Sequence, residues 1–148
     1  AMPNEDKNVM DIYEKYLPKL ENPLKLSDIL KEVTGENSPY LAVFFPGGHG
    51  ALVNLPESHD VKEVLKWAME KDRKIVTLCH GPAALLAGSI DEDKFLFDDK
   101  LGKLGVKIVN TGITGEVCKD RNVLTGDSPL AANNLGILAA DELLAMVE

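Results

Sequence analysis

The sequence contains few cysteines and no long apolar run, and each shortage excludes a class of protein. Two cysteines among 148 residues are too few for the disulfide framework of a small secreted domain. No segment approaches the ~18 consecutive apolar residues of a membrane-spanning helix, and no leader with a charged start and an apolar stretch is apparent. We therefore expect a reducing, cytoplasmic location and no membrane partner.

Basic clusters and metal-ligand motifs are also scarce. Lysine and arginine total 16 against 24 aspartates and glutamates, which gives a formal net charge of -8. An acidic chain without basic clusters is predicted to be soluble and not to bind nucleic acid. There is no CxxC pair, and His49 and His59 lack a convincing ligand set, so we expect no metal and assign both histidines structural or surface roles.

The apolar residues that are present alternate between helical and strand spacing. Hydrophobic residues make up 45% of the chain, which is enough for one domain with a real core. This alternation predicts a single α/β domain over residues 1–148 with a mainly parallel sheet. The predicted helices cover residues 4–20, 26–33, 59–71, 82–88 and 129–147, and the predicted strands cover 38–45, 74–78, 106–109 and two short segments within 115–126.

The stretch IVTLCHGPAALLAG, residues 75–88, places a potential nucleophile at a strand-to-helix turn. Cys79 would stand above the carboxyl edge of the sheet, where open α/β folds place their sites. Unpaired amides at the start of the next helix favour negative charge there, and Gly81 permits a close turn. His80 would supply a proton-transfer group or an oxyanion-binding amide. The alternative is that Cys79 is only a small buried hydrophobe and His80 only fills space.

The loop PGGHG, residues 46–50, is expected beside this turn because a right-handed crossover joins the two strands. Gly47 and Gly48 would allow backbone amides to face a substrate oxygen, although a Gly-Gly loop is also compatible with a plain tight turn. Cys118 is interpreted as incidental. The TGDSP segment, residues 125–129, would be either an anion-binding helix start or simple capping by Ser128, and capping is favoured.

Three segments together resemble the ThiJ/PfpI superfamily, and more narrowly its HchA-type branch of heat-shock chaperones and glutathione-independent glyoxalases (glyoxalase III). They are VFFPGGHGALVNLPES, VTLCHGPAALLAG and KDRNVLTGDSPLAANNLG. The resemblance implies a flavodoxin-like sandwich and a homodimer. It also implies Cys79 as nucleophile, His80 as its catalytic neighbour, and the amides of Gly48 and His80 as the oxyanion site. The implied reaction converts methylglyoxal to lactate without a cofactor.

The family resemblance also implies deglycation of methylglyoxal adducts and a holdase chaperone function. A cysteine peptidase or amidase is a third interpretation of the same turn. A thiol at such a turn is expected to oxidise readily to sulfenic or sulfinic acid, so redox sensing is open as well.

The sequence departs from the family pattern in two places. The family has an initial strand–helix–strand unit, bearing an acidic residue and metal ligands, and a later loop bearing a triad aspartate; neither is found here. Asp98 and Asp99 do not fit the aspartate motif and receive no role. We therefore expect an incomplete domain, retained from a longer protein, with a junction near Phe97 and Asp98.

Overall fold

A computed structural model describes residues 6–90, 109 and 112–148 and shows a four-stranded sheet. The strands are β1 (Ala42–Phe45), β2 (Lys74–Leu78), β3 (Val117–Asp120) and β4 (Val123–Gly126). Their order is β1-β2-β4-β3, with β1, β2 and β4 parallel and β3 antiparallel to β4. The mainly parallel sheet and the short hairpin are confirmed, although β1 is shorter than the predicted strand.

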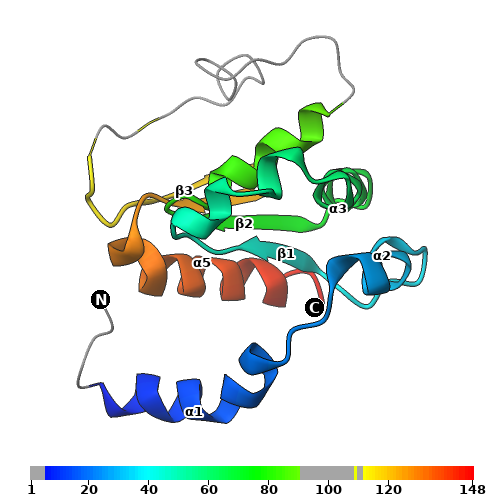
Figure 1. Ribbon diagram of the computed structural model, residues 1–148. Helices are drawn as coiled ribbons and strands as arrows, with labels where there is room; N and C mark the ends of the chain where they lie inside the picture. The colour runs from blue at the N-terminus through cyan, green and yellow to red at the C-terminus, as the bar shows by residue number, and fades with distance from the viewer. Residues whose placement is uncertain (1–5, 91–108, 110–111) are drawn as a thin grey trace.

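Helices cover both faces of the sheet (Figure 1). One face carries α3 (His59–Glu70) and the 3-10 helix η3 (Gly81–Ser89), and the other carries α5 (Ala132–Leu144). Side chains of β2 alternate between the two layers, because Ile75 packs with the α3 cluster and Val76 with the α5 cluster. This is the sandwich expected from the alternating pattern.

The helix α3 forms where the sequence predicts it. Ser58 occupies the N-cap, and its hydroxyl accepts a hydrogen bond from the Val61 amide at 3.3 Å. The apolar face of α3 is buried in the main core, together with residues from β1, β2 and η3. The buried members of this core are Phe45, Val61, Val64, Leu65, Trp67, Ala68, Ile75, Ala84 and Ala87.

Two predicted helix starts and one predicted helix end are corrected by the structure. The helix that follows Cys79 is a 3-10 helix and begins at Gly81. Gly88 lies within this helix, and the C-cap is Ile90, whose amide donates to the Ala87 carbonyl. The closing helix begins with a 3-10 turn, η4 (Pro129–Ala131). The Ser128 hydroxyl caps no amide there, because it donates to the Asp127 carboxylate at 2.7 Å.

The N-terminal helices differ in how they pack. The helix α2 (Leu26–Thr34) places three apolar side chains against the α3 core, whereas α1 (Lys7–Glu21) has no buried residue. Figure 1 shows α1 beneath α5, away from the sheet. The predicted strand 106–108, the proposed junction at Phe97 and Asp98, and Asp99 lie outside the described residues. Among the described helices, none is long and apolar enough to cross a membrane.

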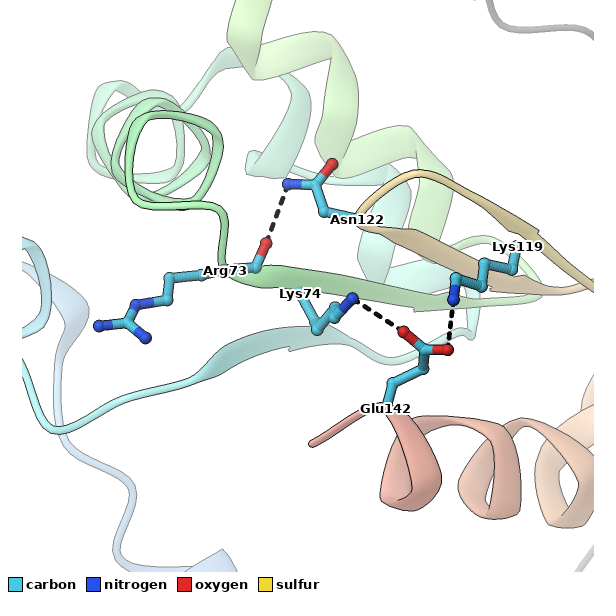
Figure 2. Close-up of polar contacts among 5 residues, drawn as sticks. All are labelled: Arg73, Lys74, Lys119, Asn122 and Glu142. Atoms are coloured by element: carbon cyan, nitrogen blue, oxygen red, sulfur yellow. Dashed lines mark hydrogen bonds and ion pairs between the residues drawn. The ribbon is translucent and has the colours of Figure 1, made fainter. Parts of the chain in front are cut away.

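A polar network ties the end of α5 to the sheet (Figure 2). The Glu142 carboxylate pairs with Lys74 at 2.8 Å and also with Lys119, which joins α5 to β2 and β3. On the turn between β3 and β4, the buried Asn122 amide donates to the Arg73 carbonyl at 2.9 Å. These contacts fix the start of β2, whose other end carries Cys79.

Candidate active site

The Cys79 turn is a backbone-strained elbow at the carboxyl end of β2. Cys79 has φ of 55°, which is the left-handed region that residues with a side chain rarely adopt. Its amide donates to the Gly126 carbonyl of β4 at 2.9 Å, so the sheet holds the strained residue in place. The predicted elbow is therefore present, and the thiol is partly exposed at the sheet edge.

The neighbouring histidine contacts the thiol directly. The Sγ of Cys79 lies 3.3 Å from Nδ1 of His80, within hydrogen-bonding reach for sulfur. A cysteine in contact with an imidazole can transfer its proton to the ring and act as a nucleophile. The structure thus brings together the two predicted catalytic side chains and favours the nucleophile interpretation over a buried hydrophobe.

The Gly47–Gly48 loop packs against the elbow. A methyl group at Gly47 would lie 2.8 Å from Cys79 Cβ and 2.8 Å from the Leu78 carbonyl oxygen, so only glycine fits this approach. Gly48 has φ of 93°, which glycine tolerates best. The glycine loop therefore lies beside the Cys79 elbow, as the sequence predicts.

The start of η3 is equally close-packed. A methyl group at Gly81 would lie 2.1 Å from the carbonyl oxygen of Phe45, the last residue of β1. Gly81 thereby lets the elbow sit against the strand that leads into the glycine loop. Within the described part of the chain, the amides of Gly48 and His80 donate to no protein acceptor, which is what an oxyanion-binding role would require.

His49 belongs to this site, although the sequence analysis assigned it a structural or surface role. Its exposed ring lies against the His80 ring, with centroids 5.2 Å apart and planes tilted by 36°. The available signal was the position of His49 in the PGGHG loop, which was expected beside the Cys79–His80 turn. His59, by contrast, is the exposed first residue of α3, and Cys118 lies on β3.

Asp127 organises the segment that follows β4. Its carboxylate accepts hydrogen bonds from the Thr114 amide at 2.6 Å, the Thr114 hydroxyl at 2.8 Å and the Gly115 amide at 3.1 Å. The Thr114 amide first, and then the Ser128 hydroxyl, lower the pKa of Asp127 from 3.8 to about 2. In the TGDSP segment, Asp127 therefore links two loops by hydrogen bonds. This differs from both expectations for the segment, which were anion binding and helix capping by Ser128.

Among residues 6–90, 109 and 112–148, no group of three or more His, Cys, Asp or Glu side chains is placed to hold a metal ion. The metal site that the family resemblance implies is thus not built from these residues.

These features define an α/β protein with a strained cysteine elbow at the end of β2, a histidine side chain in contact with the thiol, and a glycine loop packed against the elbow. The family model described as the DJ-1/PfpI family matches residues 19–140, which span both loops of the site. The chain belongs to the DJ-1/PfpI family.

The curated relatives are more than 40% identical in sequence to this chain over the aligned residues. The chain is 48% identical to a protein/nucleic acid deglycase HchA of Pseudomonas aeruginosa, over 97% of this chain and 61% of that protein. It is 44% identical to the protein of the same name in Staphylococcus aureus strain Newman, over 100% of this chain and 61% of that protein. The chain thus spans about three fifths of these relatives' length.

The match also has internal gaps. The alignment with the Pseudomonas protein extends over 177 residues, whereas this chain has 148, so at least 29 aligned positions have no counterpart in this chain. The family resemblance led us to expect segments missing from this chain.

Solved structures share the fold at lower identity. The Francisella tularensis Rapid Encystment Protein matches with a TM-score of 0.72 and 20% identity, over 96% of this chain and 73% of that chain. Glyoxalase III from Candida albicans matches with a TM-score of 0.63 and 21% identity, over 96% of this chain and 70% of that chain. The predicted fold class is confirmed.

Proposed function

We propose that the Cys79 site catalyses glutathione-independent glyoxalase chemistry on small α-oxoaldehydes such as methylglyoxal. The observation that carries this proposal is the strained elbow, which presents the Cys79 thiol 3.3 Å from His80 and beside the Gly47–Gly48 loop. The deglycase name of the curated relatives supports an aldehyde-derived substrate. The reaction needs no cofactor.

The proposed steps balance as methylglyoxal plus water giving lactate. His80 takes the thiol proton, and the Cys79 thiolate adds to the aldehyde carbon to form a hemithioacetal. The Gly48 and His80 amides stabilise the oxygen that becomes negative. A proton then leaves the former aldehyde carbon and returns to the adjacent carbon through an enediol, which gives a thioester. Water hydrolyses the thioester to lactate and frees the thiol.

The test is lactate formation from methylglyoxal by Cys79→Ala, with Cys118→Ala as the matched cysteine control. We predict that Cys79→Ala lowers the rate about 10³-fold or more, because the covalent step is lost. The Cys118→Ala variant keeps the activity, since Cys118 lies on β3 outside the site. Full turnover by Cys79→Ala would contradict the nucleophile assignment.

The relatives' name extends the proposal to glycated substrates. Deglycation of early methylglyoxal adducts would use the same thiol attack on the carbon that the aldehyde contributed. The relatives' name includes nucleic acid, which weighs against the charge-based expectation that nucleic acid is no partner. A cytoplasmic location and a homodimer remain part of the proposal.

A holdase function is the second candidate, and exposed apolar side chains favour it. Val9, Ile12 and Leu20 on α1 and Ile137 on α5 are 45–63% exposed, and an open cavity of about 620 Å³ lies between these helices. Suppression of client aggregation that survives Cys79→Ala would support an independent holdase. Cleavage of peptides that is lost in Cys79→Ala would instead promote the peptidase or amidase alternative.

A further inference from the structure

The His80 ring contacts Cys79 and His49, and only the contact with Cys79 has a role in the proposed reaction. Nδ1 lies 3.3 Å from the Cys79 thiol, and the ring contacts the His49 ring with centroids 5.2 Å apart and planes tilted by 36°. The steps proposed above use the thiol contact and leave the histidine pair without a role.

A cysteine–histidine pair works only if a third group holds the imidazole in its orientation. Rotation about χ2 of a histidine is soft, so an unsupported ring would turn Nδ1 away from the sulfur. Within the part of the chain that the structure describes, no carboxylate is hydrogen-bonded to His80. The only ring in contact with it there is His49.

His49 is held firmly enough for this task despite its exposure. It begins the 3-10 helix η1 (His49–Leu52), directly after Gly48 with its φ of 93°. The Ala51 amide donates to the Gly48 carbonyl at 3.1 Å, and Ala51 is buried with 5% of its surface exposed. The backbone of His49 is therefore anchored on both sides, and its ring is presented to His80.

We propose that His49 is a positioning residue, whose ring stacks on His80 and keeps Nδ1 on the Cys79 thiol. This inference rests on the proposed function for its catalytic consequence, but not for its effect on the thiol. The contact requires an aromatic ring at residue 49 and does not require the imidazole nitrogens, because the two rings pair with centroids 5.2 Å apart, within the range of aromatic pairs.

The test compares His49→Ala with His49→Phe, by the rate at which iodoacetamide alkylates Cys79 at neutral pH and by kcat for lactate formation. His49→Ala is expected to lower both rates about 10- to 100-fold with little change in KM, since a misdirected group loses turnover before binding. His49→Phe restores most of both rates because it keeps the ring. His59→Ala is the matched histidine control and leaves both rates unchanged.

Two results would overturn the proposal. Wild-type rates in His49→Ala would show that His80 needs no support, and a His49→Phe variant as slow as His49→Ala would show that the imidazole itself is required. The alkylation rates decide between these outcomes even if the chain produces no lactate, so failure of the proposed function and failure of this inference are distinguishable.

Discussion

At the scale of single residues, the site depends on backbone positions where a side chain does not fit. Gly81 is the sharpest case, because a methyl group there would meet the Phe45 carbonyl oxygen at 2.1 Å. The backbone of β1 or of the elbow would have to move to accept it. Gly81 therefore allows the elbow to pack against the end of β1, the strand that leads into the glycine loop.

We predict that Gly81→Ala lowers the free energy of unfolding by about 3 kcal/mol or more, at the upper end of overpacking effects. Gly136→Ala is the matched control, since a methyl group there meets nothing within 4 Å and α5 gains about 0.5–1 kcal/mol of helix propensity. Urea denaturation of both variants measures the difference. Equal stabilities would show that the elbow is not close-packed.

Sequence reasoning placed Cys79 and His80 on an elbow beside the Gly47–Gly48 loop, but it gave His49 no part in the site. Cys79 and His80 could be predicted because an apolar strand runs directly into a Gly-Pro helix start. The expected approach of the two loops did not reveal the contact between the His49 and His80 rings, since ring orientation depends on the detailed packing of the loops. The Ser128 hydroxyl was misjudged for a similar reason, because the adjacent Asp127 carboxylate competes for it.

At the scale of elements, Asp127 ties the 112–116 segment to the start of the closing helix. The lowered pKa of its carboxyl, about 2 against 3.8, means that the ionised form is stabilised by folding. The resulting stability is fully present above about pH 4 and is lost as the pH falls toward 2. Protonation removes the charge that the Thr114 and Gly115 amides bind.

We therefore predict that Asp127→Asn destabilises the protein at neutral pH and flattens the loss of stability between pH 4 and 2. Asp120→Asn is the control, because its carboxylate pairs with an exposed Arg121, and exposed pairs contribute little. Urea midpoints over a pH series measure both. An unchanged acid profile in Asp127→Asn would show that the tie does not contribute to stability.

Element types followed the sequence more closely than element ends. The parallel strands and α3 could be predicted, since buried apolar runs and a capping serine define them. Whether the helix after the elbow is 3-10 or α depends on how it packs against α3 and the end of β1, which spacing does not encode. The missing segments could be suspected only through the family resemblance.

At the scale of the whole molecule, α1 stands apart from the core. It has no buried residue, and its Val9 and Ile12 side chains line the open cavity beside α5. We predict that removing residues 1–22 changes the free energy of unfolding by less than about 1 kcal/mol, as for other exposed segments. It should also reduce binding of a hydrophobic dye. A large loss of stability would show that α1 is part of the fold.

The central claim is that the Cys79 thiolate adds directly to an α-oxoaldehyde. The most direct measurement is the rate at which iodoacetamide alkylates Cys79 and Cys118 as methylglyoxal is titrated into the native protein, followed by mass spectrometry of the two peptides. We predict that methylglyoxal protects Cys79 saturably, at concentrations that leave Cys118 unprotected. Equal protection of the two cysteines, or none, would contradict the account.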